Sequence, residues 1–121
     1  MLMAIFEKPV NVIGRVEDLL EAKVEPIILK SQLKEIERIA SSRRWRASRI
    51  AKTLLKLIES KFEVVDDPGG NVDEAIVGVS KREGFIVATN DRELRRKLRK
   101  NGVTVIYMKS DGKFELEGYQ P

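Results

Sequence analysis

The chain has 121 residues, of which 42% are hydrophobic and 35% charged, which suits one folded domain and excludes a disordered chain. Its formal net charge is +4, and no apolar run is long enough for a spanning helix or a signal sequence. We therefore expect a soluble, cytoplasmic protein with no membrane partner. It has no Cys and no His, so disulfides, thiolate nucleophiles and histidine bases are excluded, and any catalysis must use carboxylates, Lys, hydroxyls or an oxygen-bound metal.

Apolar spacing predicts helices and strands that alternate along the chain. The predicted elements are a helix over 9–23, a strand at 26–29, a helix capped by Ser31, a helix over 43–60, a strand at 62–66, a helix that begins after Asn71 and ends at Gly84, a strand at 85–89, a helix over 91–101 closed by Gly102, and a strand at 103–108. The helix over 43–60 is predicted to bury Ala47, Ile50, Ala51, Leu54 and Ile58. This order predicts a three-layer α/β/α fold with a mainly parallel sheet.

Three acidic residues follow three of these strands. Glu35 lies one turn into the helix after the strand at 26–29, Asp73 lies in the first turn of the helix after the strand at 62–66, and Asp91 lies immediately beyond the strand at 85–89. Ligands of an open parallel sheet bind outside the carboxyl ends of its strands, so these carboxylates are predicted to share one rim and to suit Mg²⁺ or Mn²⁺. Alternatively, Asp73 and Asp91 only favour helix dipoles and Glu35 is an ordinary exposed residue. Asp66 and Asp67 lie in turn-forming sequence and rank below these three.

Positive charge is concentrated in two segments. Residues 30–61 hold ten Lys and Arg against three Glu, and residues 92–100 hold six against one Glu. Such segments in an otherwise acidic chain favour a polyanionic partner. Alternatively, they are solvated helix faces in a heat-stable protein, because Lys and Glu enrichment with few Asn and Gln is also typical of thermophiles.

The helix over 43–60 carries an aromatic residue among cations. Trp45, Arg49, Lys52 and Lys56 fall within an arc of about 60° at helical spacing. Base stacking on Trp45 beside a phosphate track would suit RNA binding by these four residues. Alternatively, Trp45 folds onto the core or forms a contact between two copies of the chain.

Three segments resemble the PIN domain (PilT N-terminus) family in residues and in spacing: Ser31-Gln-Leu-Lys-Glu35-Ile-Glu, Gly70-Asn-Val-Asp73-Glu-Ala-Ile and Val87-Ala-Thr-Asn-Asp91-Arg-Glu-Leu. The ending from Val103 to Gly118 is similar to archaeal members near the ribosomal-RNA-processing branch. The resemblance implies a Mg²⁺- or Mn²⁺-dependent endoribonuclease with Glu35, Asp73 and Asp91 as catalytic metal ligands. It implies supporting polar roles for Thr89 and Asn90, and RNA as substrate. An antitoxin-like protein partner follows from family analogy only.

The chain departs from the family at its beginning. Family members open with an apolar strand ending in Asp-Thr-Asn, whereas Met1-Leu-Met-Ala4 resembles the residues after that motif. We therefore expect one PIN-like domain over 1–121, truncated at its N-terminus, that lacks the first central strand and its Asp. The strands at 26–29 and 85–89 must then pair with each other, accept residues 1–6 between them, or stay separated. Without that Asp we expect weak or no catalysis; the alternative is a non-catalytic RNA-binding or protein-interaction module on the same fold.

Overall fold

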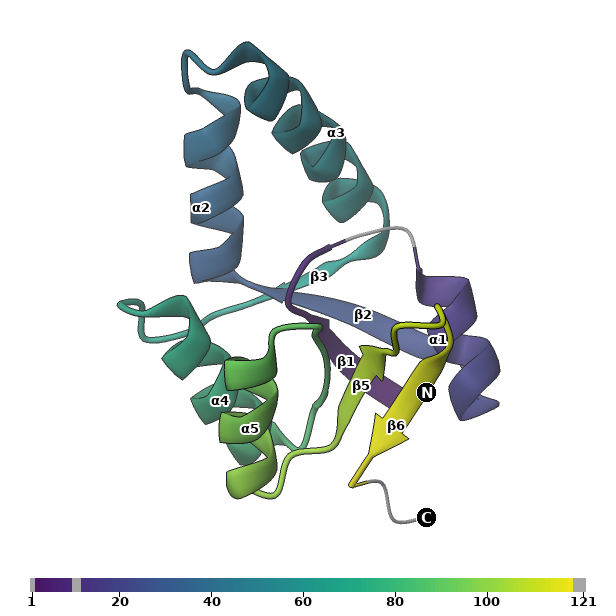
Figure 1. Cartoon of the computed structure of the whole chain (residues 1–121). Helices are drawn as coiled ribbons and strands as arrows, with labels where there is room; N and C mark the ends of the chain where they lie inside the picture. Colours follow the sequence, from purple (N-terminus) through teal and green to yellow (C-terminus); the bar gives the residue numbers. More distant parts are fainter. Residues whose placement is uncertain (1, 10–11, 119–121) are drawn as a thin grey trace.

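The computed structural model describes residues 2–9 and 12–118, which form a six-stranded sheet and five helices (Figure 1). The strands are β1 (Leu2–Phe6), β2 (Val24–Leu29), β3 (Glu63–Val65), β4 (Ile86–Ala88), β5 (Val105–Met108) and β6 (Phe114–Glu117). The helices are α1 (Ile13–Leu20), α2 (Lys30–Ala40), α3 (Trp45–Lys61), α4 (Val72–Glu83) and α5 (Arg92–Lys100). The sheet order is β3-β2-β1-β4-β5-β6, and every neighbouring pair is parallel except β5–β6. The expected mainly parallel α/β fold is confirmed.

The central strand that the sequence analysis expected to be missing is present, so that prediction is wrong. β1 lies between β2 and β4 and pairs parallel with both, so that Ala4 is opposite Pro26 on one side and Ile86 on the other. Of the three arrangements considered, the chain adopts the one in which its first residues fill the gap. Ala4, Ile5 and Phe6 are all buried, because helices cover both faces of a central parallel strand. Such a strand has no alternation of polar and apolar residues, which is the pattern that identifies half-exposed strands.

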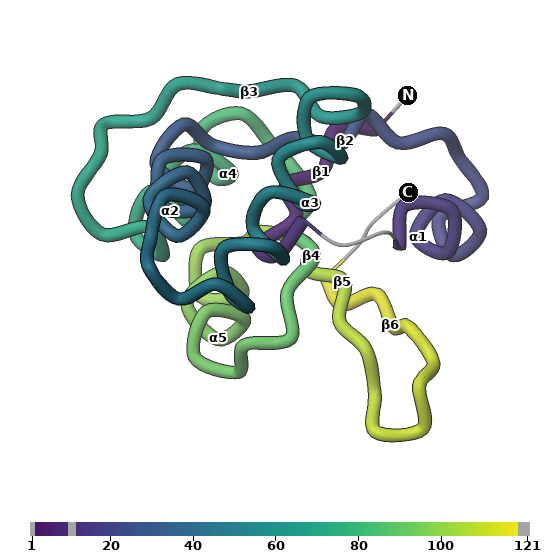
Figure 2. Tube along the Cα trace, turned by 90° about the horizontal axis from the view of Figure 1, so that it is seen from above, coloured from purple at the N-terminus to yellow at the C-terminus, as the bar shows by residue number. Residues whose placement is uncertain are grey.

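Successive side chains of β1 point to opposite faces of the sheet and into two different layers. Ile5 packs against α4 and α5, where Ile76 and Leu94 are fully buried. Phe6 points the other way, into the cluster that includes Val16 of α1. Seen from above, α1 lies on one side of the sheet and the α4–α5 pair on the other (Figure 2). The expected three-layer arrangement is therefore present.

Helices α2 and α3 form a hairpin that rises past the end of β2 (Figure 1). A third apolar cluster joins them to Ile28 of β2, and it includes Ile36 and Ile58. The Ser48 hydroxyl, buried between the two helices, donates a hydrogen bond to the carbonyl of Ala40 at 2.6 Å. The predicted burial of Ile50 is wrong: its side chain is 59% exposed, because it lies outside the face that α3 turns toward α2.

Several predicted boundaries differ from the observed ones. The Asn71 side chain caps α4 by accepting from the Glu74 amide at 3.1 Å, and Gly84 ends that helix with a φ of 73°, so both predictions are confirmed. The predicted Ser31 cap is wrong, since the N-cap of α2 is Leu29, two residues earlier. The predicted helix over 9–23 is shorter as α1, and its residues 10–11 lie outside the described part. The antiparallel strand β6 was not predicted. No helix among the described residues has the length and apolarity needed to cross a membrane.

Candidate active site

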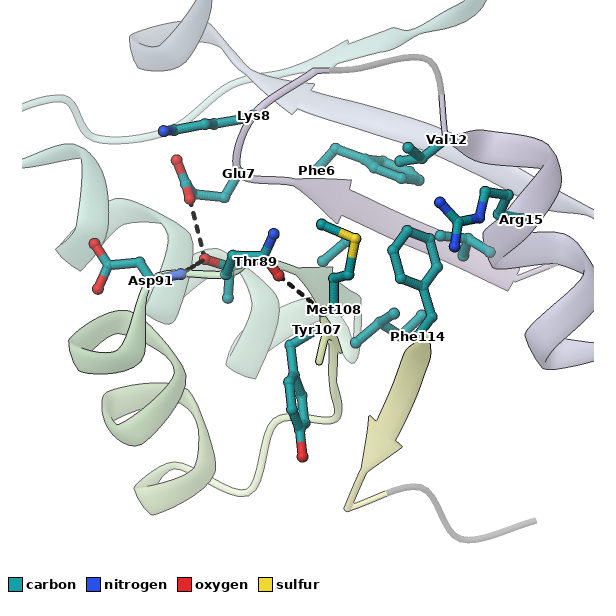
Figure 3. Close-up of a pocket in the computed structure, with 14 residues that line it drawn as sticks. Phe6, Glu7, Lys8, Val12, Arg15, Thr89, Asp91, Tyr107, Met108 and Phe114 are labelled. Atoms are coloured by element: carbon teal, nitrogen blue, oxygen red, sulfur yellow. Dashed lines mark hydrogen bonds between the residues drawn. The ribbon is translucent and has the colours of Figure 1, made fainter. Parts of the chain in front are cut away.

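A cleft of about 560 Å³ opens at the carboxyl ends of β1, β4 and β5 (Figure 3). It is lined by Phe6, Glu7, Lys8, Val12, Arg15, Val16, Ala88, Thr89, Asn90, Asp91, Ile106, Tyr107, Met108 and Phe114. β1 and β4 are adjacent in the sheet but far apart in sequence, so the chain leaves the sheet in different directions after each of them. Such a switch point is where open α/β sheets bind their ligands.

Glu7 stands at the carboxyl end of β1, in the middle of the cleft's polar side. Its amide donates to the Ala88 carbonyl at 2.9 Å, which extends the β1–β4 ladder by one bond. Its Oε1 accepts a hydrogen bond from the Thr89 hydroxyl at 3.0 Å (Figure 3). Burial raises the pKa of the Glu7 carboxyl; the Thr89 hydrogen bond and Lys8 oppose this, whereas the Asp91 and Asp73 charges add to it, and the net pKa is raised.

Thr89 links Glu7 to Asp91. The threonine side chain is 5% exposed, and its hydroxyl accepts from the Asp91 amide at 3.0 Å while donating to Glu7. Asp91 is the N-cap residue of α5, with its Oδ1 accepting from the Leu94 amide at 3.0 Å. Asp91 therefore caps α5, and the same hydrogen bond holds its carboxylate at the rim of the cleft. Its interpretation as a helix-capping residue is compatible with its interpretation as a ligand.

Gln32 was not predicted from the sequence, yet it holds the end of β1. Its side chain is 4% exposed and donates from Nε2 to the carbonyls of Phe6 and Glu7, both at 3.0 Å. Its Oε1 accepts from the Leu29 amide at 2.8 Å, so all three bonds fix the junction between β1, β2 and α2. Similarly, Asn90 Oδ1 accepts from the Met108 amide at 2.8 Å and ties the end of β4 to β5.

The predicted acidic residues differ in how they relate to this cleft. Asp91 lines it, and Asp73, half-buried at the start of α4, acts on the Glu7 carboxyl through its charge. Glu35 is exposed and paired with Arg38 one turn later on α2, at 2.5 Å. Hydrogen bonds from Arg38 hold the pKa of the Glu35 carboxyl below its ordinary value. Within residues 2–9 and 12–118, no three acidic residues are placed to hold one metal ion.

The donor chemistry nevertheless fits a hard divalent cation. Glu7 and Asp91 offer carboxylate oxygens on either side of one threonine, and the charge of Asp91 makes ionisation of Glu7 less favourable. A cation relieves repulsion of this kind, and Mg²⁺ and Mn²⁺ prefer oxygen ligands. Glu7 was missed by the sequence analysis, although an apolar run followed at once by a carboxylate is the same signal that identified Asp91.

The remaining predicted residues lie elsewhere. Asp67 accepts from the Ser31 amide at 2.8 Å and Asp66 pairs with Lys30 at 3.7 Å. Trp45 is 67% exposed at the start of α3, with the Arg49 guanidinium 5.2 Å from its ring centre. Lys52 and Lys56 are also exposed, so the four residues predicted to bind RNA do share a solvent-facing surface on α3.

The sheet order and its acidic carboxyl edge define an α/β domain of PIN type. A family model described as "PIN like domain" matches residues 1–111, and the chain belongs to this family. It is 34% identical to Ribonuclease VapC4 of Methanocaldococcus jannaschii over 119 residues, an alignment covering 97% of this chain and 91% of the relative. It is 30% identical to Ribonuclease VapC9 of Archaeoglobus fulgidus over 117 residues, covering 97% and 84%.

Solved structures share the fold at lower identity. The PIN domain endonuclease Utp24 superposes with a TM-score of 0.74 at 20% identity, covering 97% of this chain and 92% of that one. The VapBC2 structure from Rickettsia felis, bound to a DNA fragment from its promoter, gives a TM-score of 0.60 at 15% identity, with coverage of 88% and 98%. At these identities the likeness concerns the fold alone.

Proposed function

We propose that this protein is a metal-dependent endoribonuclease that cuts RNA in the cleft at the carboxyl edge of the sheet. The observation that carries the proposal is a set of hydrogen bonds that fixes two carboxylates at the switch point of the sheet. Thr89 donates to the Glu7 carboxylate and accepts from the Asp91 amide, and the Asp91 carboxylate accepts from the Leu94 amide. The two curated relatives, at 34% and 30% identity, are named ribonucleases, which supports RNA as the substrate.

Glu7, Glu35, Asp73 and Asp91 are the proposed ligands, with Glu7 in place of the Asp that opens the family motif. Bound Mg²⁺ or Mn²⁺ would supply the Lewis acidity that activates water and stabilises the leaving oxygen of a phosphodiester. Thr89 keeps Glu7 oriented, and Asn90 keeps the loop that carries Asp91 attached to β5. Lys8 and Arg15 line the same cleft and are placed to neutralise phosphate charge.

Breaking the ion pair between Glu35 and Arg38, so that Glu35 can act as a metal ligand, requires little free energy. Its partner Arg38 has a side chain that is 69% exposed, and exposed ion pairs contribute only about 0–1 kcal/mol. Because α2 begins where β2 ends, Glu35 lies one turn beyond the same edge of the sheet as Glu7. Glu35 does not line the cleft, so its proposed role as a ligand requires both release from Arg38 and movement of the side chain toward the ion.

Cleavage of a single-stranded RNA oligonucleotide with Mn²⁺ tests this function. We expect each of three variants, Glu7→Gln, Glu35→Gln and Asp91→Asn, to lower the cleavage rate at least about 100-fold, because each removes a charge that holds the ion. Glu37→Gln is the matched control: it lies two residues from Glu35 on α2, is exposed, and should cleave at the wild-type rate. Cleavage that persists in EDTA, or in Glu7→Gln, would contradict the proposal.

The expectation of weak catalysis, which rests on the absent Asp of the first strand, stays a prediction. The strand itself is present as β1, and Glu7 and not Asp follows it. The rate at which the wild-type protein cleaves RNA at saturating Mn²⁺ tests this expectation. Absence of cleavage together with retained RNA binding would favour the alternative of a non-catalytic binding module. The exposed Trp45–Arg49 pair on α3 is the observation that supports that alternative, because an aromatic ring beside a cation suits base stacking.

We further propose the setting in which this activity operates. A protein partner of antitoxin type is supported by the VapC relatives and by the VapBC2 structure with the same fold. The two curated relatives come from archaea, which supports an archaeal source. We also propose that the enzyme is heat-adapted and cytoplasmic, and that it consists of one PIN-like domain or of an oligomer of such domains. Size-exclusion chromatography of the purified chain would show its oligomeric state.

A further inference from the structure

Helix α5 has one apolar side and is otherwise strongly basic. Leu94 and Leu98 are fully buried against the sheet, four residues apart on one face. Its remaining residues are six cations and Glu93. A shallow hollow of about 600 Å³ lies along this surface, and we call its five cations the α5 basic face: Arg92, Arg95, Arg96, Arg99 and Lys100, with Glu117 at the border.

Most of this charge is not neutralised within the protein. Arg99 pairs with Glu117 at 3.5 Å and donates to the Val103 carbonyl at 3.0 Å. In the part of the chain that the structure describes, Arg92, Arg96 and Lys100 have no carboxylate within ion-pair distance. The arrangement therefore leaves three exposed cations free to meet an external anion.

The placement of Arg92 and Arg96 is unfavourable for the helix itself, whereas Arg99 and Lys100 lie in the last turn, where the helix dipole favours cations. Like charges three or four residues apart destabilise a helix, as Arg92 and Arg96 do here. Arg92 is also the first helical residue, where the helix dipole disfavours a positive charge. Stability of the helix does not account for Arg92 and Arg96, whereas binding of a polyanion does.

The α5 basic face is continuous with the cleft. Arg95 stacks its guanidinium over the Tyr107 ring at 3.9 Å from the centroid, and Tyr107 lines the cleft while Arg95 lines the basic hollow. Asp91, at the rim of the cleft, is the residue from which α5 begins. A strand lying along α5 would therefore arrive at the carboxylates without crossing another element.

We propose that the α5 basic face binds the phosphate backbone of single-stranded RNA and leads the strand into the cleft over the Arg95–Tyr107 stack. This inference rests on the proposed function for the nature of the ligand. The inference assigns the main RNA contact to α5 and not to the exposed cations Arg49, Lys52 and Lys56 of α3. The reason is that the α5 basic face begins beside Asp91, whereas these α3 residues do not line the cleft.

Binding of a fluorescein-labelled oligouridine in EDTA, followed by anisotropy between 50 and 200 mM salt, tests the inference. The variant Arg92→Gln/Arg96→Gln/Lys100→Gln should weaken binding about tenfold or more. It should also reduce the slope of log K against log salt by about 2, as expected for three lost phosphate contacts on a single strand. All three side chains are exposed and unpaired with carboxylates, so the melting temperature should not fall, and removal of the repulsion between Arg92 and Arg96 should raise it slightly.

The matched control is Arg43→Gln/Arg44→Gln/Lys61→Gln, which removes three exposed charges from the α2–α3 hairpin and should change the dissociation constant less than about threefold. An equal loss in this control, or a larger loss in Arg49→Gln/Lys52→Gln/Lys56→Gln than in the α5 variant, would overturn the inference. Displacement of the labelled RNA by polyglutamate as effective as that by unlabelled oligouridine would also overturn the inference. Because binding is measured without metal, a chain that binds through α5 but does not cleave would contradict the proposed function alone.

Discussion

At the scale of single residues, Thr89 and Gln32 position Glu7 from two sides. Thr89 holds its carboxylate by a hydroxyl that is itself fixed by the Asp91 amide, and Gln32 holds its backbone carbonyl. Both side chains are buried, so water competes little for these bonds. The direction of the Glu7 carboxylate is therefore set before any ligand arrives.

The raised pKa of Glu7 predicts that metal binding depends on pH. Below its raised pKa, Glu7 carries a proton that a metal must displace, so Mn²⁺ affinity should increase as the pH rises through that pKa and then level off. Calorimetric titrations at pH 5 and pH 7 in two buffers of different ionisation enthalpy measure the protons released. We expect release at pH 5 in the wild type and less in Glu7→Gln.

The raised pKa of Glu7 also predicts how the free energy of unfolding depends on pH, which tests the pKa shift independently of metal binding. A carboxyl whose pKa is raised by folding destabilises the native state as the pH rises from its unfolded value through its folded value. Glu7→Gln should therefore be more stable than the wild type at pH 7, and the difference should shrink toward pH 4. A variant that is less stable at pH 7 would show that the Thr89 hydrogen bond outweighs burial.

At the scale of elements, the start of α2 shows how a distant loop can cap a helix. Asp67, in the Pro-Gly-Gly loop after β3, accepts from the Ser31 amide through Oδ1 and from the Gly69 amide at 3.1 Å through Oδ2. Burial acts to raise the pKa of Asp67, but these hydrogen bonds and the charge of Lys34 outweigh it, and the pKa is lowered. Sequence reasoning assigned the cap to Ser31 because such reasoning considers local neighbours only.

Replacement of Asp67 measures this cap. Asp67→Ala should lower the free energy of unfolding at pH 7 by about 1 kcal/mol, the usual value of an N-cap side chain. The neighbouring Asp66→Ala is the control and should cost less than about 0.5 kcal/mol, since Asp66 is exposed and only pairs with Lys30. The difference should disappear in acid, where Asp67 is protonated. Equal losses in urea denaturation would rule out the cap.

The elements that could be predicted from the sequence are those whose signals are local. Asn71 and Gly84 mark the ends of α4, and apolar periodicity identifies the buried faces of the helices. β1 was missed although it is as apolar as the recognised strand at 26–29, because residues 1–4 were matched to the segment that follows the opening strand of the family. β6 pairs with β5 by residues such as Leu116 and Ile106, and its burial is only partial, so little in its own sequence requires a strand. In both cases the neighbouring strands determine the structure.

At the scale of the whole molecule, the sheet predicts an order of local stability. β1 has a paired strand on each side, whereas β3 has three residues, lies at an edge and is largely exposed. Hydrogen exchange measured by mass spectrometry should give peptides from 2–9 and 86–89 the slowest exchange, near that of global unfolding, and the peptide over 62–66 faster exchange. Similar protection of β1 and β3 would contradict this order.

Only some residues of the candidate site could be predicted from the sequence, because their prediction depends on which strands are recognised. Asp73 and Asp91 could be placed at the carboxyl edge because each follows a strand that the sequence identifies, and Glu7 could not because its strand was not recognised. Likewise, nothing local distinguishes Gln32 from an exposed glutamine, since its partners are carbonyls 25 and 26 residues away. Contacts of this kind require the tertiary fold to be known.

The central position of β1 also bears on how the protein is made. Glu7 and Thr89 are 82 residues apart, so the ribosome releases Glu7 long before the strand that will carry its partner. Until β4 emerges, β1 can pair only with β2, and pairing across so long a separation is a late step in folding. The carboxylates of the cleft are thus brought together only when most of the chain has been synthesised. If the protein cleaves RNA as proposed, a growing chain beside the messenger RNA that encodes it would not yet have an assembled cleft with which to cut that message.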